Sequence, residues 1–229
     1  MSSRSQAERY IKLGKVIVDG GVVTKAGAKV NESSEVSVDV DRQYVSRAGH
    51  KLASVAQDFY VNFEGSVVLD VGSSTGGFTD YALQHGASLV YAVDVVTNQL
   101  HPNLRSNDKI ELHEKTDIRD FNRPSHKLGI VVIDVSFISL REILPHIANN
   151  LIDTDTLVLA MVKPQFEATR EQVNKGVVKN KSIRRKILDE FEVWGGGYFA
   201  VLDKRDSSVA GAKGNVERFY KLRLPKSKR

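Results

Sequence analysis

Two kinds of hydrophobic pattern divide the chain into a short first part and a longer second part. From residue 46 onward, short apolar runs rich in β-branched residues alternate with segments in which apolar residues recur every three or four positions. Apolar runs bounded by glycine or polar residues predict buried strands, whereas the longer spacing predicts amphipathic helices. Because the two kinds of segment alternate, we expect an α/β fold with a doubly wound, mostly parallel sheet for residues 46–229.

The predicted strands of the second part are the apolar runs. They cover residues 67–70, 88–94, 110–113, 128–134, 156–162, 198–203 and 217–224. Helices are expected over 48–59, 139–149 and 182–194, with a further one after the glycine-rich loop that follows the first strand. The spacing of the last two strands fits a hairpin-like pair with a long connection.

The first part, residues 1–45, has the pattern of a small α+β module. Residues 6–14 have the spacing of a short helix that stops at Gly14. Residues 15–25 and 28–39 have the pattern of short strands, and Asp19-Gly20 is a strong signal for a hairpin turn. A segment of this length cannot bury a substantial core alone, so we expect it to be an appendage to the second part.

Composition narrows the class of protein and of partner. The hydrophobic content of 41% and charged content of 27% are typical of a globular protein, and no run approaches the ~18 apolar residues that span a bilayer. The N-terminus lacks the apolar region of a secretory signal, so we expect a cytoplasmic protein without membrane contact. The chain has no cysteine and its 6 histidines lack metal-ligand spacing, so we expect no metal. The net charge of +5 suits an anionic partner.

A loop of small residues follows the first strand of the second part. Asp70 ends the strand, and Gly72 and Gly76 stand farther apart than the first two glycines of the dinucleotide-binding motif. Glycines let a ligand approach the backbone closely, while the Asp70 carboxylate repels a pyrophosphate and attracts an ammonium. This pattern favours S-adenosylmethionine over NAD. Asp94, at the end of the second strand, stands where a ribose diol is held, and Asp117, after the third, is placed to face an adenine amino group.

Four charged residues are candidates for chemistry. Asp134 and Lys163 end successive strands, so we expect them to be neighbours at one edge of the sheet. A lysine beside an aspartate can hold a hydroxyl in line with a methyl sulfonium, and a second cation that lowers its pKa lets it accept the hydroxyl proton. Lys51 is the candidate for that second cation, and Glu217 could orient one ammonium. The alternative is that all four form ordinary ion pairs.

Five segments together resemble the TlyA family, whose members are named as haemolysins and as ribosomal RNA 2′-O-methyltransferases, and which is similar to the FtsJ methyltransferases. The segments are residues 46–52, 70–79, 134–140, 162–167 and 214–217. The resemblance implies a Rossmann-like methyltransferase fold that acts on cytidine ribose in ribosomal RNA or ribosomal subunits. It implies a Lys-Asp-Lys-Glu catalytic tetrad at Lys51, Asp134, Lys163 and Glu217. It also implies a methyl-donor site at Asp70, Gly72, Ser73, Gly76, Gly77, Phe78, Asp94 and Asp117.

Two other regions point to RNA. Residues 14–30 resemble the RNA-binding module of ribosomal small-subunit protein S-four and of pseudouridine synthases, through Gly14-Lys-Val-Ile-Val-Asp-Gly20, Gly27 and Val30. In that module a further helix, before the one expected here at residues 6–14, completes the RNA-binding face, and this sequence starts too late to contain it, so we expect an incomplete module. Residues 163–186 hold eight basic residues against two acidic ones, which predicts a rim that contacts phosphates or, alternatively, a solvated face.

Three other functions stay open at the level of sequence. They are a membrane-lytic protein, as the haemolysin label suggests, a catalytically inactive RNA-binding protein, and a nucleotide-binding oxidoreductase. Lysis calls for an insertion helix that the pattern does not offer, and the glycine spacing disfavours the oxidoreductase. Of the remaining candidates, we expect Phe166 to anchor a loop in the core rather than stack on a base, and His50 to be structural.

Overall fold

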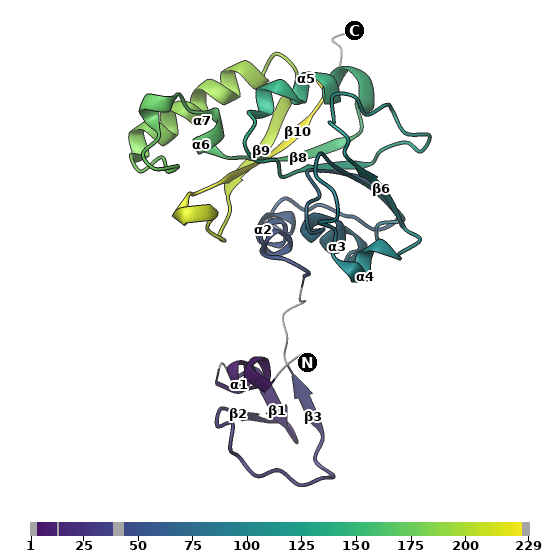
Figure 1. The fold of residues 1–229 in the computed structure, drawn as a ribbon, viewed down its shortest axis with the longest axis vertical. Helices are drawn as coiled ribbons and strands as arrows, with labels where there is room; N and C mark the ends of the chain where they lie inside the picture. Colours follow the sequence, from purple (N-terminus) through teal and green to yellow (C-terminus); the bar gives the residue numbers. More distant parts are fainter. Residues whose placement is uncertain (1–3, 13, 39–43, 226–229) are drawn as a thin grey trace. The chain divides into compact units, whose positions relative to one another are not determined.

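The computed structural model describes residues 4–12, 14–38 and 44–225, which belong to two compact units, Met1–Gln43 and Tyr44–Arg229. Figure 1 follows the chain from the first unit, in purple, to the end of the second, in yellow.

The first unit is a helix followed by a small antiparallel sheet. Its elements are α1 (Arg4–Lys12), β1 (Val16–Val18), β2 (Gly21–Val23) and β3 (Val36–Val38), with strand order β2-β1-β3. The predicted hairpin is confirmed: Asp19 and Gly20 adopt left-handed φ angles of 49° and 80° between β1 and β2. The strand predicted over 28–39 is wrong for most of its length, because only 36–38 pair within the described residues. Asn31 and Ser34 form a turn instead, as these residue types favour.

The second unit contains a seven-stranded sheet with the order β6-β5-β4-β7-β8-β10-β9. Its strands are β4 (Val67–Val71), β5 (Leu89–Asp94), β6 (Ile110–Glu114), β7 (Ile130–Ile133), β8 (Leu157–Val162), β9 (Ala200–Asp206) and β10 (Arg218–Arg223). Strands β4 to β8 are parallel to their neighbours, whereas β10 pairs antiparallel with both β8 and β9. The mostly parallel sheet and the terminal antiparallel pair are therefore confirmed.

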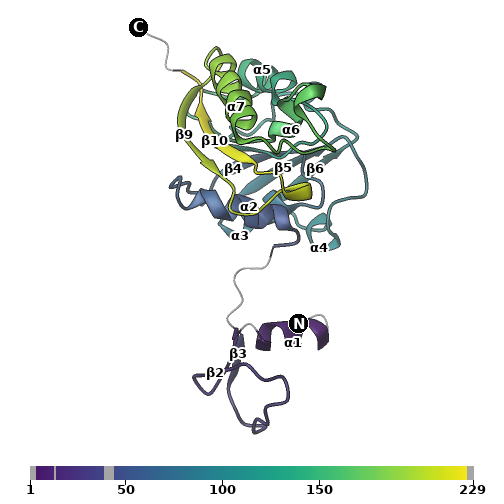
Figure 2. The same cartoon turned by 90° about the vertical axis from the view of Figure 1, so that its left-hand side faces the viewer.

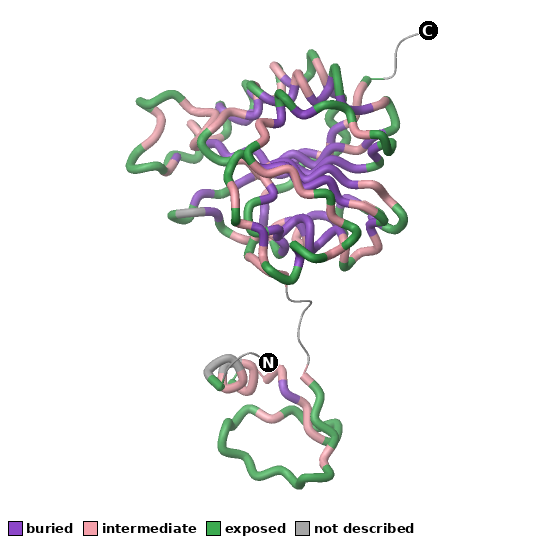
Figure 3. The backbone as a smooth tube through the Cα atoms, turned by 45° about the vertical axis from the view of Figure 1, so that its right-hand side comes forward, coloured by how far each residue is buried: buried purple, intermediate pink, exposed green. Residues whose placement is uncertain are grey.

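Helices cover both faces of this sheet. Figures 1 and 2 show α2 (Arg47–Ala56) and α3 (Gly77–Gln84) on one face, and α5 (Leu144–His146) and α7 (Lys181–Gly195) on the other. Figure 3 shows the buried central strands between them. One hydrophobic cluster includes Leu52 and Phe78 from the first pair of helices, and a second includes Leu144 and Phe191 from the other pair. The two hydrophobic clusters lie on opposite faces of the sheet, so the parallel strands are buried on both sides.

The helix predicted over 139–149 is broken into three short turns. A 3₁₀ turn at Leu140–Glu142 precedes α5, and a π turn at Ile147–Leu151 follows it. Pro145 lies in α5 and supplies no backbone N–H, so it cannot continue a helix from the preceding turn. The short helices α4 (Pro102–Arg105) and α6 (Pro164–Glu167) were not expected from the sequence pattern.

The topology gathers one end of several strands at a single edge of the sheet. The carboxyl ends of β4, β5, β7 and β8 lie at this edge because the strands are parallel neighbours. Strand β10 runs the other way, and Arg218 at its start pairs with Val162 at the end of β8. Residues that follow β8 and residues that precede β10 are thus brought together. Among the residues described, no helix is long and apolar enough to cross a membrane.

Candidate active site

The glycine-rich loop after β4 packs directly against the end of β7. Gly72 has a left-handed φ of 80°, and a Cβ atom there would lie 2.7 Å from the carbonyl oxygen of Asp134. Gly76 has a φ of 91°, and a Cβ atom there would lie 2.4 Å from Leu104. Both positions therefore require glycine for their backbone conformation and for close packing.

Asp70 is fully buried at the end of β4, beneath this loop. Its Oδ2 accepts a hydrogen bond of 2.6 Å from Thr79 Oγ1, whereas its Oδ1 has no hydrogen-bond partner among the described residues. Burial is the main cause that raises the pKa of Asp70 to about 7. The Ser73 hydroxyl is also buried and lacks a hydrogen-bond partner in the described part of the chain. Buried oxygens of this kind are costly unless a ligand satisfies them.

Asp70 and Ser73 line a cavity of about 270 Å³, which we call the Asp70 cavity. Its other walls come from α2, from the start of α3 and from the ends of β7 and β8, through Lys51, Phe78, Asp134 and Lys163 among others. An ammonium could donate hydrogen bonds to the two unsatisfied oxygens. The chemistry of this cavity therefore fits the amino-acid end of S-adenosylmethionine.

Asp94 and Asp117 line a second cavity of about 340 Å³, the Asp94 cavity, which shares Gly72 and Asp134 with the first. Asp94 accepts hydrogen bonds of 2.8 Å from the backbone N–H groups of Ser74 and Val96, one on each carboxylate oxygen. Each oxygen keeps a further lone pair that a ribose hydroxyl could use. These contacts also tie the glycine-rich loop to the end of β5.

Asp117 is already engaged by a neighbour. Arg119 places its guanidinium 3.0 Å from Oδ1 and 2.7 Å from Oδ2 of Asp117, and its backbone N–H also donates to Oδ1. These hydrogen bonds lower the pKa of Asp117. Asp117 therefore reaches the cavity as a paired carboxylate rather than a free one.

The four predicted tetrad residues form two close pairs. Lys163 Nζ lies 2.6 Å from Asp134 Oδ1, and it donates a hydrogen bond of 2.8 Å to Ser136 Oγ. The Asp134 contact is an ion pair and not a directed hydrogen bond, since Oδ1 accepts none from the described residues. Lys51 Nζ donates a hydrogen bond of 2.6 Å to Glu217 Oε2. The side chains of Lys163 and Glu217 are only 9% and 2% exposed, so both pairs lie largely out of solvent.

A third cavity of about 440 Å³, the Glu217 cavity, is lined by Lys51, Lys163 and Glu217. Two aromatic rings, Phe137 and Phe166, also line it, with their centroids 5.3 Å apart. Phe166 is half-buried and Lys163 Nζ lies 5.9 Å from its ring centroid. The expectation that Phe166 anchors the core is therefore wrong.

The structure brings most of the predicted residues to these adjoining cavities. Lys51, Asp70, Gly72, Ser73, Gly77, Phe78, Asp94, Asp117, Asp134, Lys163 and Glu217 each line at least one of them. Gly76 lines none of the three; it caps the start of α3 and packs under Leu104. His50 lines none either, and its ring packs edge-on against Tyr44.

Sequence reasoning missed several residues of the site. Ser136 holds the Lys163 ammonium, and Ser74 joins Asp94 to the loop. Both belong to segments that were singled out, but nothing in their spacing shows which neighbour they contact. Within the described residues, no group of three or more His, Cys, Asp or Glu side chains could hold a metal ion.

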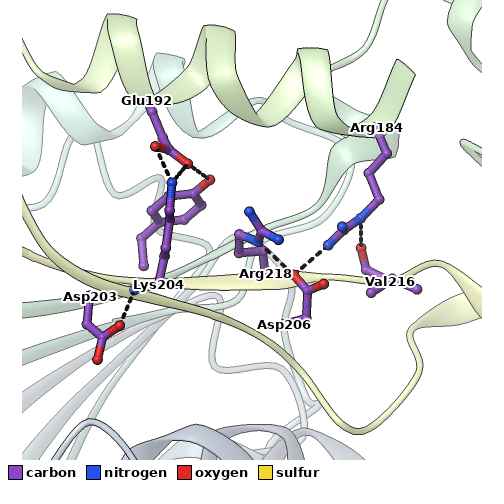
Figure 4. A network of polar contacts seen from close by, with 8 residues as sticks. Arg184, Glu192, Asp203, Lys204, Asp206, Val216 and Arg218 are labelled. Carbon is purple, nitrogen blue, oxygen red and sulfur yellow. Dashed lines mark hydrogen bonds and ion pairs between the residues drawn. The ribbon is translucent and has the colours of Figure 1, made fainter. Parts of the chain in front are cut away.

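Figure 4 shows a network that fastens α7 to the last two strands. Asp206 accepts hydrogen bonds from Arg184 Nη2 at 2.7 Å and from Arg218 Nε at 2.6 Å, and Arg184 Nε donates to the carbonyl of Val216 at 3.1 Å. The network therefore fixes the backbone immediately before Glu217. It also removes Arg184 from the basic residues that are free to contact a ligand.

The basic stretch 163–186 divides into paired and unpaired side chains. Arg185 and Lys186 lie 3.8 Å from acidic residues one helical turn away in α7. Four exposed side chains make no ion pair with the described residues: those of Arg170, Lys175, Lys179 and Lys181. These four precede or begin α7, so the unpaired charge lies nearer to Lys163 along the chain.

Comparison with known proteins is consistent with this architecture. The FtsJ-like methyltransferase family model matches residues 44–224, and the S4 domain model matches residues 1–36. Hemolysin A of Brachyspira hyodysenteriae is 38% identical over 94% of this chain and 91% of its own length. The 16S/23S rRNA (cytidine-2′-O)-methyltransferase TlyA of Mycobacterium tuberculosis (strain CDC 1551 / Oshkosh) is 35% identical over 96% of this chain and 84% of its own.

A solved structure agrees with the sequence relatives. A protein from Streptococcus thermophilus, named as a hemolysin, superimposes with a TM-score of 0.78 at 39% identity, covering 99% of this chain and 85% of that one. With a mostly parallel sheet, two lysine–carboxylate pairs at its edge and a family match over residues 44–224, the chain belongs to the FtsJ-like methyltransferases.

Proposed function

We propose that this protein is an S-adenosylmethionine-dependent RNA 2′-O-methyltransferase that acts on cytidine ribose in ribosomal RNA. The observation that carries the proposal is the pairing of Lys163 with Asp134, and of Lys51 with Glu217, beside a cavity in which Asp70 Oδ1 has no hydrogen-bond partner among the described residues. The two lysines can contact an acceptor hydroxyl, and the buried Oδ1 of Asp70 can accept a hydrogen bond from an ammonium. The relatives named as cytidine-2′-O-methyltransferases supply the substrate class.

Three acidic residues are the proposed anchors of the donor. Asp70, with the Ser73 hydroxyl, would receive the donor ammonium, because both offer unsatisfied acceptors. Asp94 would accept from the ribose diol, and Asp117 would face the adenine amino group as a paired carboxylate. When bound, S-adenosylmethionine supplies a methyl group activated by a sulfonium. Because Gly72 has no Cβ atom, the loop that lines the donor cavities can pack directly against the backbone of Asp134.

Lys163 is the proposed base for the acceptor. In its amine form it would hold the ribose hydroxyl and take up its proton as the oxygen–carbon bond forms and the bond between the methyl carbon and the donor sulfur breaks. Asp134, 2.6 Å away, would then stabilise the resulting ammonium. Lys51 would place a second positive charge near the developing alkoxide, held in position by Glu217.

RNA docking would use parts of the chain outside the tetrad. The exposed side chains Arg170, Lys175, Lys179 and Lys181 are placed to contact phosphates, because the described residues offer them no acidic partner. The S4 domain would add contacts of its own. A ribosomal RNA substrate implies that the protein works in the cytoplasm.

The test is methyl transfer to ribosomal RNA that lacks this modification. The purified protein and S-adenosylmethionine are incubated with ribosomal subunits and with free ribosomal RNA, and digested nucleosides are analysed by mass spectrometry. The proposal predicts 2′-O-methylcytidine above the level of a reaction without protein. Methylation on a base, or no methylation when calorimetry shows donor binding, would contradict it.

A further inference from the structure

Glu167 joins the segment after Lys163 to the segment after Asp134. It ends α6, four residues beyond Lys163, and its side chain is only 1% exposed. Its Oε2 accepts a hydrogen bond of 2.5 Å from Ser139 Oγ, and its Oε1 accepts one of 2.7 Å from the backbone N–H of Leu140. Burial raises the pKa of Glu167, and these hydrogen bonds oppose that shift. Both carboxylate oxygens are thus engaged by residues 139–140.

The segment between Asp134 and Ser139 contains a strained residue. Phe137 has a left-handed φ of 67°, which is unfavourable for an aromatic residue. Phe137 is 91% exposed, so burial of the residue does not hold this conformation. Strained conformations persist only where the surroundings fix them on both sides.

Two contacts fix this segment, one on each side of Phe137. Before it, Ser136 Oγ accepts the hydrogen bond from Lys163 Nζ. After it, Ser139 donates to Glu167 and its Oγ also accepts a hydrogen bond of 3.1 Å from the backbone N–H of Arg141. Both partners of the segment, Lys163 and Glu167, lie on the same short stretch 163–167.

The fixed segment separates two of the cavities. Ser136 and Phe137 line both the Asp94 cavity and the Glu217 cavity. A shift of these two residues would therefore change the boundary between the proposed donor side and the proposed acceptor side. Methyl transfer is sensitive to such a shift, because it needs the reacting atoms in line.

We infer that Glu167 is a positioning residue for the reaction: by holding Ser139 and Leu140, it keeps Ser136 and Phe137 at the boundary between the donor and acceptor cavities. This inference rests on the proposed function. It assigns Glu167 no contact with either substrate.

The first test replaces Glu167 in the full chain. Glu167→Ala should lower kcat for methyl transfer by about ten- to a hundredfold while the Kd for S-adenosylmethionine changes by less than about threefold. Glu167→Gln should regain most of the activity, since its amide can accept from Leu140 and donate to the Ser139 hydroxyl. Glu171→Ala is the matched control, because it removes an exposed carboxylate four residues later and should leave kcat unchanged.

A second test asks whether Glu167 acts through the strained segment. Phe137→Gly relieves the left-handed strain, so adding Glu167→Ala to it should lower kcat by only about two- to threefold. A carboxylate that merely stabilises the fold would cause the same loss in both backgrounds. Equal losses, or an unchanged kcat in folded Glu167→Ala protein, would overturn the inference.

Ser139→Ala covers the case in which Glu167→Ala does not fold. It removes one of the two hydrogen bonds from the other side and should lower kcat by about three- to tenfold with unchanged donor affinity. An unchanged kcat in this variant would also overturn the inference. Wild-type protein that binds S-adenosylmethionine but methylates no ribosomal RNA would contradict the proposed function instead.

Discussion

The Asp70 end and the Lys163 end of the site differ in how their polar groups are satisfied. At the Asp70 end, the buried Oδ1 of Asp70 and the buried hydroxyl of Ser73 lack hydrogen-bond partners among the described residues. At the Lys163 end, Lys163 already pairs with Asp134, and Lys51 with Glu217. The first end thus offers acceptors that a ligand could satisfy, whereas the second is assembled within the chain.

This difference implies different sensitivities. Binding at the Asp70 end should depend on the charge of Asp70 and hence on pH, because burial raises the pKa of this carboxyl to about 7. Chemistry at the Lys163 end should instead depend on keeping both members of each pair. Substitutions at one end should thus change donor binding, and substitutions at the other should change methyl transfer.

Removal of Lys163 should have the largest effect. Lys163→Ala deletes the proposed base and should lower kcat by ~10²–10⁴-fold. Donor affinity should change little, since the unsatisfied acceptors lie on Asp70 and Ser73. The measurement is methyl transfer under saturating donor, with Lys186→Ala as a control that removes an exposed, paired lysine from the same stretch. Equal kcat values for the two variants would remove Lys163 from the chemistry.

A methyl group at Gly72 should disturb both ends at once. Gly72→Ala would add a Cβ atom 2.7 Å from the Asp134 carbonyl oxygen at a φ of 80°, so the free energy of unfolding should fall by about 2–4 kcal/mol and donor affinity by at least about tenfold. Gly65→Ala is the matched control, because Gly65 has a φ of 68° but no atom within 4 Å of the added Cβ. It should cost only about 1 kcal/mol. Urea unfolding and calorimetry distinguish the clash from the backbone strain; similar costs for both variants would contradict the close packing.

Donor affinity should weaken as the pH falls below 7. The pKa of Asp70 is raised to about 7 by burial, so the unliganded protein carries a protonated Asp70 below that pH. A donor ammonium favours the carboxylate, so binding must release that proton, and the Kd should rise by up to about tenfold per pH unit below 7. Titration calorimetry between about pH 5.5 and 7.5 keeps the donor α-amino group charged. Asp70→Asn should bind weakly with no such slope, and a flat wild-type profile would show that Asp70 does not contact the donor.

The raised pKa of Asp70 also makes the free energy of unfolding depend on pH, in the direction opposite to that of donor affinity. The pKa of Asp70 is higher in the folded protein than its ordinary value of 3.8, so the folded state binds the proton more tightly than the unfolded state. The contribution of Asp70 to the free energy of unfolding should decrease as the pH rises from about 4 to 7. Because the Kd for S-adenosylmethionine should be lower at pH 7.5 than at pH 6, the donor should raise the Tm more at pH 7.5.

Removal of a surface contact far from both ends should have the smallest effect. Lys204 contacts Glu192 at 2.6 Å in the network of Figure 4 and is 44% exposed. Lys204→Ala should change the free energy of unfolding by less than about 1 kcal/mol and leave kcat and donor affinity unchanged. A clear loss of methyl transfer would show that the α7 network contributes to the site beyond holding the backbone.

The sequence pattern was sufficient for the strands of the second unit and for the side chains that follow them. Residues after successive parallel strands meet at one edge, so the proximity of Asp134 and Lys163 could be predicted from their order alone. The neighbourhood of Glu217 follows from the antiparallel pairing of β10 with β8. These predictions succeed because strand ends are set by short-range patterns and by a few topological rules.

Contacts that depend on loop conformation could not be predicted. Nothing in the spacing shows that Ser136 accepts from Lys163, that Arg119 engages Asp117 or that Phe137 takes a left-handed backbone. The packing of Gly76 against Leu104 could not be predicted either, because Leu104 belongs to a helix that the pattern did not reveal. Such features emerge only when separate segments pack together.

We assign donor binding to the Asp70 end and methyl transfer to the Lys163 end. The most direct test measures both donor binding and methyl transfer for Asp70→Asn and Lys163→Ala. We expect Asp70→Asn to raise the Kd for S-adenosylmethionine while retaining transfer at saturating donor. We expect Lys163→Ala to keep the wild-type Kd and lose transfer. Loss of donor binding in Lys163→Ala, or loss of transfer at saturating donor in Asp70→Asn, would contradict the separation of the two ends.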